Sequence, residues 1–146
     1  MEKFSFILSS VLILSVFVNL NSAHPYKQFW EECKAAEKAT DEEARAMRNP
    51  DQPKSRAMKC VIACIGEKSG KLVNNKLNGE AVMESMKHSP NYNEDMHRNF
   101  SEMVEECKDV NDADRCESAS KIMDCMTDAA AKRGIKREYF MQGNRK

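Results

Sequence analysis

Residues that interrupt helices are scarce in this sequence. Its 146 residues include five glycines and four prolines, whereas alanine, glutamate, lysine and methionine recur throughout. Helices tolerate glycine and proline least, and the four frequent residues are among those that favour helix. Because folds with many short strands need turns rich in glycine and proline, this scarcity argues against such a fold. The composition therefore predicts an all-α protein.

An excess of charge of either sign is also lacking. The chain has 23 Lys and Arg residues against 23 Asp and Glu residues. Nucleic acids and anionic membrane surfaces are bound by strongly basic fields, so neither is expected as a partner. The two signs are interspersed along the chain, which is typical of the solvated exterior of a helical protein.

Catalytic and metal-binding motifs are absent as well. The sequence contains no Gly-x-Ser-x-Gly elbow, no phosphate-binding loop and no His-Glu-x-x-His metal motif. A zinc site that includes Cys60 and Cys64 is an alternative, but an even number of cysteines in an exported chain favours disulfides. We therefore expect no enzyme activity, no cofactor and no metal.

Long apolar runs are absent after the first 23 residues. Before that point, Lys3 precedes an apolar stretch over residues 4–18, and Asn21, Ser22 and Ala23 follow it. This is the layout of a secretory signal peptide. The alternative is a membrane anchor, which needs about 20 apolar residues, whereas this stretch has 15 and is interrupted by serines. We predict a signal peptide over residues 1–23 and a secreted domain over residues 24–146, without membrane insertion.

The chain does contain an ordered set of six cysteines, and an even number in a short exported chain implies disulfides. They are Cys33, Cys60, Cys64, Cys107, Cys116 and Cys125. Cys60 and Cys64 share a helix face with Cβ atoms about 5–6 Å apart, whereas a disulfide needs about 3.8 Å. Cys116 and Cys125 lie about 13.5 Å apart along one helix. Neither pair can bond, which leaves ten of the fifteen possible pairings open.

Apolar periodicity and capping residues predict six helices. With their caps, they cover about residues 26–39, 40–48, 54–66, 78–88, 93–108 and a last helix that runs to about residue 133. Thr40 begins a capping box, Asn78 caps the fourth helix, and either Asp112 or Asp114 caps the last one. Gly134 ends that helix. Residues 67–77 are expected to form a longer connection.

The cysteine pattern resembles that of a known family. It is similar to the pattern of the six-cysteine insect odorant-binding proteins: one cysteine, then Cys60-x3-Cys64 on a helix, then a gap of 42 residues and Cys107-x8-Cys116-x8-Cys125. The resemblance implies a compact bundle of six disulfide-linked helices that encloses an apolar cavity. It also implies the disulfides Cys33–Cys64, Cys60–Cys116 and Cys107–Cys125, a set that is among the ten open pairings.

The resemblance also implies a ligand-binding wall on the inward helix faces. Methionine is frequent there, and its flexible, polarizable side chain adapts to ligands of varied shape. The alternative is that these residues fill a solid core. The expected wall residues are Ile62, Val82, Met83, Met86, Phe100, Met103, Val104, Met123 and Met126.

Two further features bear on ligand binding. In the tail over residues 135–146, Ile135, Tyr139 and Phe140 are candidates to fold over the mouth of the cavity, and the alternative is a frayed terminus. Of the three histidines, His97 is the candidate for pH-dependent binding, because imidazole titrates near physiological pH.

The function implied by the resemblance is a secreted, extracellular, non-enzymatic carrier. It would bind small hydrophobic ligands, such as odorants, pheromones or similar lipids, and transport them through aqueous lymph. A sensory receptor and a second copy of the chain are further partners that the resemblance allows. One alternative is a carrier of the same fold in haemolymph, saliva or reproductive fluid. The other is a protein-interaction module with a solid core.

Overall fold

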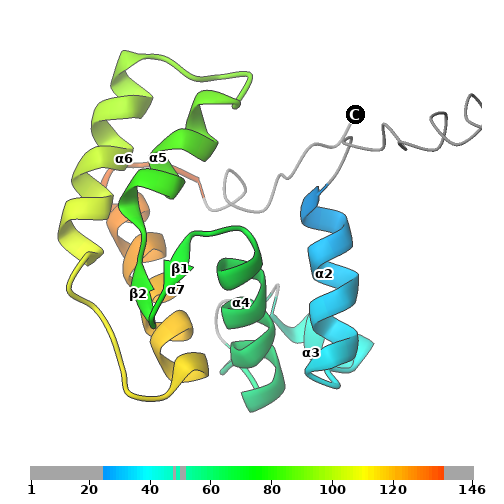
Figure 1. Ribbon diagram of the computed structural model, residues 1–146. Coiled ribbons are helices and arrows are strands. Elements are labelled where there is room, and N and C mark those ends of the chain that lie inside the picture. Colours follow the sequence, from blue (N-terminus) through cyan, green and yellow to red (C-terminus); the bar gives the residue numbers. More distant parts are fainter. Residues whose placement is uncertain (1–24, 48, 50–51, 137–146) are drawn as a thin grey trace, which may run out of the picture.

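The computed structural model describes residues 25–47, 49 and 52–136, and within these ranges the chain forms six helices and one small hairpin (Figure 1). The all-α prediction is confirmed. The proposed signal peptide, Tyr139 and Phe140 lie outside the described residues. The elements are α2 (Pro25–Ala36), α3 (Asp41–Ala46), α4 (Arg56–Lys68), β1 (Leu72–Val73), β2 (Lys76–Leu77), α5 (Gly79–Lys87), α6 (Glu94–Cys107) and α7 (Arg115–Lys132).

Side-chain caps begin most of these helices, as the sequence predicts. At α3, Thr40 and Glu43 form a reciprocal box, in which Thr40 Oγ1 accepts from the Glu43 amide at 3.1 Å and Glu43 Oε2 accepts from the Thr40 amide at 2.8 Å. Asn78 caps α5 and Asn93 caps α6. Of the two candidates for α7, Asp114 is the cap. Such caps satisfy amide groups that have no partner within the helix.

Helix α7 ends two residues before Gly134, and this glycine terminates it, as predicted. Gly134 has a φ of 67°, which a residue without Cβ adopts at little cost. The Gly134 amide donates to the Ala131 carbonyl and the Ile135 amide donates to the Ala130 carbonyl, both at 3.0 Å. This bonding pattern is the Schellman motif. It turns the chain so that Ile135, a residue of the predicted cavity lid, packs against the core.

The hairpin was not predicted, and its turn explains why it forms. Asn74 and Asn75 have φ angles of 51° and 62°, and a two-residue hairpin turn of type I′ needs positive φ at both central positions. Asparagine tolerates that region better than most residues. Leu72 then pairs with Leu77 across the two strands. Strands of two residues are too short to show a period-2 pattern, so the asparagine pair was the sequence feature that could have indicated the hairpin.

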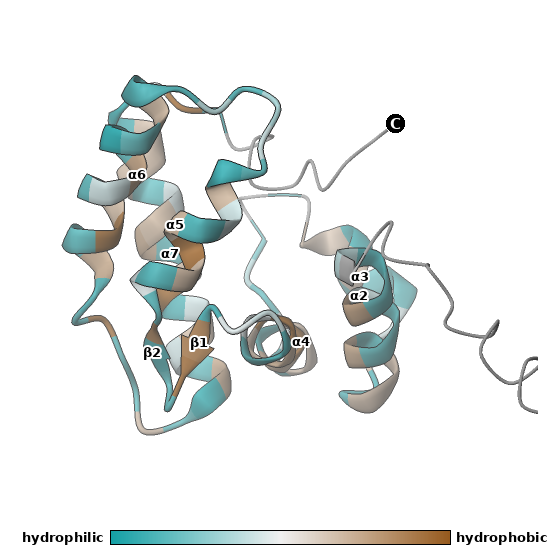
Figure 2. Cartoon of the chain, turned by 45° about the horizontal axis from the view of Figure 1, so that its top comes forward, coloured by the Kyte–Doolittle hydropathy of each residue, from teal (hydrophilic) through white to brown (hydrophobic). Residues whose placement is uncertain are grey.

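Helix α4 separates two parts of the hydrophobic core. Figure 2 looks along α4, with the hairpin and α5–α7 on one side of it and α2 with α3 on the other. Met58, Val61 and Cys64 on α4 are buried with Cys33 of α2. The larger cluster lies between α5, α6 and α7, and it contains Val82, Phe100, Met103, Cys107, Ile122, Met126, Ala129 and Ala130.

Three disulfides join four of the helices in series. Cys33–Cys64 links α2 to α4, Cys60–Cys116 links α4 to α7, and Cys107–Cys125 links α6 to α7. This is the pairing that the family resemblance implied. Each bond typically contributes about 2–4 kcal/mol by restricting the unfolded chain. The hairpin and α5 carry no cysteine, so packing and hydrogen bonds alone hold them.

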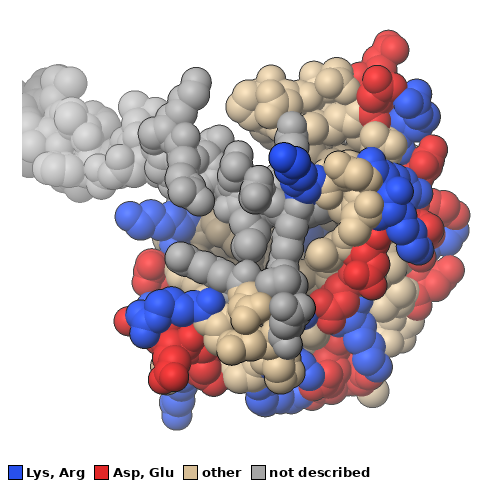
Figure 3. All heavy atoms as spheres, turned by 180° about the vertical axis from the view of Figure 1, so that it is seen from behind, with Lys and Arg blue, Asp and Glu red and all other residues tan. Residues whose placement is uncertain are grey.

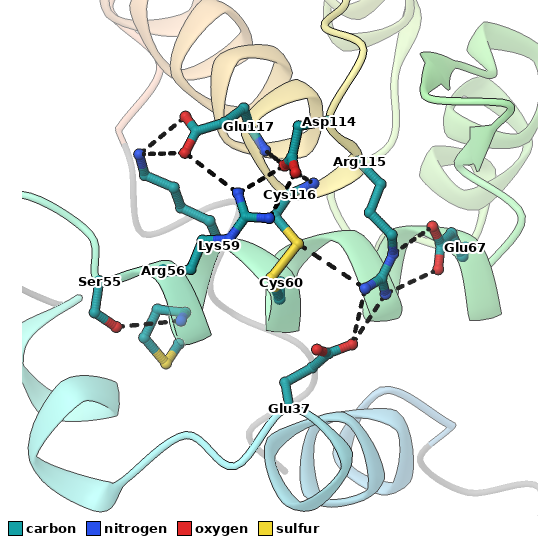
Figure 4. Close-up of a disulfide and its surroundings, with 11 residues drawn as sticks. Glu37, Ser55, Arg56, Lys59, Cys60, Glu67, Asp114, Arg115, Cys116 and Glu117 are labelled. Carbon is teal, nitrogen blue, oxygen red and sulfur yellow. Dashed lines mark hydrogen bonds and ion pairs between the residues drawn. A yellow bond between two sulfur atoms is a disulfide. The ribbon is translucent and has the colours of Figure 1, made fainter.

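Ion pairs reinforce the Cys60–Cys116 region (Figure 4). The Arg115 guanidinium lies between two carboxylates, at 3.0 Å from Glu37 and 3.1 Å from Glu67, and so connects α7 to α4 and to the end of α2. Arg56 on α4 makes a bidentate pair with Asp114 at 2.8 and 2.5 Å. Two-pronged pairing of this kind fixes orientation as well as distance.

The exterior agrees with the balanced charge of the sequence. On the face shown in Figure 3, acidic and basic side chains of the described residues alternate without a large field of one sign. Within the described part of the chain, no helix is long and apolar enough to cross a membrane.

Candidate ligand-binding cavity

A cavity of about 210 Å³ lies between α4, the hairpin, α5, α6 and α7. An engineered apolar cavity of about 150 Å³ is large enough to bind benzene, so this one has room for a small organic molecule. Most of its wall is apolar. The lining residues are Ile62, Gly66, Lys71, Leu72, Leu77, Val82, Ser85, Met86, Phe100, Ala119, Ile122, Met123 and Met126.

Most of the residues expected at a ligand-binding wall border this cavity. Those that do are Ile62, Val82, Met86, Phe100, Met123 and Met126. Met83, Met103 and Val104 are placed elsewhere. Met103 is fully buried in the cluster formed by α5, α6 and α7, and Met83 and Val104 are half-buried against the same cluster. These three residues lie on the inward faces of α5 and α6, but their side chains pack against the core cluster and do not border the cavity.

Other wall residues were not among the expected ones. The hairpin contributes Lys71, Leu72 and Leu77, and helix α7 contributes Ala119 and Ile122. Ile122 lies four residues before Met126 and on the same helix face, so the helical period could have identified it. The hairpin residues could not be assigned to the wall from the sequence, because the turn that folds them back toward the helices was not predicted.

Gly66 shapes one side of the cavity. A Cβ atom on Gly66 would lie 2.5 Å from Leu72 Cδ1 and 2.6 Å from Leu72 Cγ. The missing side chain therefore lets β1 pack closely against α4, with Leu72 as part of the wall. Glycine at this position serves close packing rather than a special backbone conformation.

Among the described wall residues, Lys71 is the only charged one. Its side chain is half-buried, and burial lowers the pKa of its ammonium group. The other polar wall residue, Ser85, donates a hydrogen bond to the Val82 carbonyl of its own helix at 2.8 Å. The wall thus combines an extensive apolar surface with one cation.

A second hollow, of about 510 Å³, has a different character. Its wall is mostly polar or charged, with Gln52, Pro53, Lys54, Lys59, Glu117, Ser120, Lys121 and Asp124. The charges are already paired, for example Lys59 with Glu117 at 3.0 Å and Lys54 with Asp124 at 2.5 Å. An apolar ligand would have to separate these pairs, so this hollow does not suit one.

Two other expectations concern titrating and metal-binding groups. The pH-switch candidate His97 is exposed, and its Nδ1 atom lies 2.9 Å from the Tyr92 hydroxyl, outside the cavity wall. Within the described residues, no group of three or more His, Cys, Asp or Glu side chains is arranged to hold a metal ion.

Disulfide-linked helices around a small apolar cavity define an all-α binding protein for small molecules. Residues 18–129 match the PBP/GOBP family, and the chain belongs to this family. Its members are odorant-binding carrier proteins rather than enzymes.

Individual relatives agree with this assignment. General odorant-binding protein 19d of Drosophila melanogaster is 28% identical over 109 residues, which are 73% of each chain. The odorant-binding protein dmelOBP28a of the same species shares the fold with a TM-score of 0.65 and 26% identity, over 76% of this chain and 93% of that one. The fatty acid binding protein OBP56a from the oral disk of the blowfly Phormia regina has a TM-score of 0.61 and 32% identity, over 73% and 90%.

Proposed function

We propose that this protein is a secreted carrier that reversibly binds small hydrophobic molecules in the cavity of about 210 Å³ and transports them through aqueous lymph. The ligands would be odorants, pheromones or similar lipids. The observation that carries the proposal is the cavity wall, in which Lys71 and Ser85 are the only polar residues among those described. Pockets for small ligands are typically apolar with a few polar groups.

The composition of the wall suits reversible binding of varied ligands. Met86, Met123 and Met126 all border the cavity, and methionine side chains repack easily around different shapes. Burial of about eight methylene groups, at about 0.8 kcal/mol each, would supply about 6 kcal/mol before the costs of association. Since a dissociation constant of 1 μM corresponds to about 8 kcal/mol, we expect weaker binding, with dissociation constants from tens of micromolar upward.

Secretion and the two chain ends complete the proposal. Residues 1–23 would act as the signal peptide, and residues 24–146 would be the carrier domain. Tyr139 and Phe140 would cover the cavity mouth and slow ligand release. Ile135, the third candidate for this cover, packs on the core cluster that borders the cavity.

A non-olfactory carrier is the second candidate. The blowfly relative is described as a fatty acid binding protein of the oral disk, which favours a lipid carrier in a fluid other than antennal lymph. The fold and the cavity are the same in both cases. The third possibility, an interaction module with a solid core, is disfavoured because an apolar hollow of about 210 Å³ opens between the helices and the hairpin.

Displacement of a neutral fluorescent naphthalene probe tests the carrier proposal. The chain would be expressed by secretion, so that the three disulfides form, and titrated with the probe and then with alcohols, esters and acids of increasing length. We expect saturable uptake of the probe and its release by small apolar competitors. If the folded protein binds neither the probe nor any competitor, the carrier proposal is wrong. The tissue that secretes the protein separates the two carrier candidates.

A further inference from the structure

Lys71 differs from the other lysines near the core, because its surroundings are apolar and no acidic side chain of the described residues pairs with it. Lys54 and Lys59, on the polar side of the molecule, each form an ion pair with a carboxylate of α7. Lys71 forms no ion pair with any carboxylate of the described residues, and burial alone accounts for the lowered pKa of its ammonium group. A buried or half-buried cation without a partner is unfavourable, because it loses hydration without gaining an opposing charge.

The backbone on either side of Lys71 is firmly held. The Asn78 side chain donates to the Gly70 carbonyl at 2.9 Å, and the Asn78 amide donates to the Lys71 carbonyl at 2.8 Å. The next residue, Leu72, pairs with Leu77 in the hairpin. The hairpin itself packs against α4 through β1 and against α7 through β2 (Figure 1). The position of the Lys71 Cα atom relative to the cavity is therefore set by the fold.

We propose that the cavity selects amphiphiles with a single carboxylate, whose head group pairs with the Lys71 ammonium while the tail lies along the methionine-rich wall. This inference rests on the carrier function proposed above and specifies its ligand class. The carboxylate supplies the counter-charge that the described residues do not provide, and charge-assisted hydrogen bonds of this type are about twice as strong as neutral ones. A cationic ligand is disfavoured for the same reason.

The size of the cavity limits the length of the tail. If a cavity of about 150 Å³ holds the six carbons of benzene, a cavity of about 210 Å³ holds about eight non-hydrogen atoms by the same ratio. Octanoate has a tail of seven carbons beyond its carboxyl group, which is close to this number, and its neutral counterpart is octan-1-ol.

Calorimetric titration with sodium octanoate and with octan-1-ol tests the inference. The wild-type chain, with its three disulfides, is compared with Lys71→Met, which keeps the length of the side chain but not its charge. Lys76→Met is the matched control, because Lys76 lies exposed in the same hairpin and outside the wall. Lys71→Arg keeps a positive charge in the wall, and Lys71→Gln replaces the methionine variant if that variant does not fold.

We expect Lys71→Met to weaken octanoate binding by about tenfold to a hundredfold and to change octan-1-ol binding by less than about threefold. Lys76→Met should leave both affinities as in the wild type, and Lys71→Arg should retain most of the octanoate affinity. An equal loss for both ligands, or no loss for octanoate, overturns the inference while the carrier function stands. If the wild type binds neither ligand nor the naphthalene probe, the carrier function itself fails.

Discussion

The side chain of Leu72 occupies the space beside Gly66 that any other residue would need for its own Cβ atom. The distance from that Cβ position to Leu72 Cδ1 would be 2.5 Å, well inside van der Waals contact. Both residues border the cavity. Close approach between α4 and β1 therefore determines one dimension of the cavity.

Gly66→Ala should move the hairpin and impair ligand binding. Because the new methyl group displaces Leu72, we expect about a threefold to tenfold loss of probe affinity together with a loss of stability of about 1–3 kcal/mol. Gly79→Ala is the control: its Cβ would lie 2.5 Å from Val104 Cγ1, outside the cavity wall. It should cost stability with less than about a twofold change in affinity. Probe titration and urea denaturation measure the two effects, and equal affinity losses would contradict this account.

Ala119→Leu should fill the cavity at little cost in stability. Ala119 is buried and borders the cavity, whereas Ala129 is equally buried in the packed cluster outside it. Extra methylene groups in a packed core typically cost about 1–3 kcal/mol, so Ala129→Leu should be destabilised by that amount and Ala119→Leu by clearly less. Ala119→Leu should also lose probe binding by about tenfold or more. Retention of full binding would show that the probe occupies another site.

The Cys60–Cys116 disulfide should contribute more to stability than Cys107–Cys125. It spans 56 residues of sequence rather than 18, and the chain-entropy model assigns about 4 and 3 kcal/mol to loops of these lengths. We expect the double alanine variant of the first pair to lose about 2–5 kcal/mol. Urea denaturation of both double variants gives the comparison, and a reversed order would show that strain or residual structure outweighs loop length.

Stability should fall in acid partly through Asp114. Hydrogen bonds from the Arg56 guanidinium and from the backbone amides of Glu117 and Cys116 lower the pKa of the Asp114 carboxyl. The folded state therefore favours the ionised carboxylate. Its contribution to stability is present above the unfolded-state pKa, about pH 4, and is lost as the pH falls below that value toward the folded-state pKa.

Asp114→Asn isolates this charge effect, because asparagine still caps a helix. We expect a melting temperature a few degrees lower than the wild type near neutral pH, with a difference that shrinks at about pH 2–3. Thermal melts followed by circular dichroism at both pH values provide the measurement. A difference that is independent of pH would exclude the carboxylate charge as its source.

Lys38→Gly should stabilise the protein. Lys38 has a φ of 55°, and its amide and that of Ala39 bond back to the end of α2. A residue with a Cβ atom pays about 1–2 kcal/mol for this left-handed conformation, and part of that is offset by the greater freedom of glycine in the unfolded chain. We expect a gain of about 0.5–1 kcal/mol. Lys38→Ala, which has a Cβ atom but no charge, should show no such gain in the same denaturation experiment.

The helices and their caps were largely readable from the sequence, because the interactions that form them connect residues three or four apart. The Thr40 box and the Asn78 cap are examples. The sequence could not decide whether Asp112 or Asp114 caps α7, since both are acidic residues shortly before the helix. The tertiary partner Arg56, 58 residues away in sequence, bonds to Asp114, while Asp112 pairs with Lys121.

The residues of the cavity wall could be predicted from the sequence only in part. The helical period places Met86, Phe100 and Met126 on inward faces, but it places Met103 there equally well. Whether an inward side chain borders a cavity or contacts another side chain depends on the distance between its helix and the neighbouring element. Met103 is fully buried among the packed side chains of the larger core cluster, whereas Phe100 and Met126 border the space beside the hairpin.

The order and spacing of apolar residues, caps and cysteines determined by themselves that this chain is a bundle of helices, and the cysteine geometry narrowed the disulfide pairings to ten. Only the tertiary structure decided that residues 70–78 fold back as a hairpin and bring Lys71 into an apolar wall. The physical reason is the sequence distance over which the interactions act, because capping and helical periodicity connect residues within about one helical turn. The cavity, by contrast, depends on close contacts between residues such as Gly66 and Leu72, which meet only when separate elements pack together.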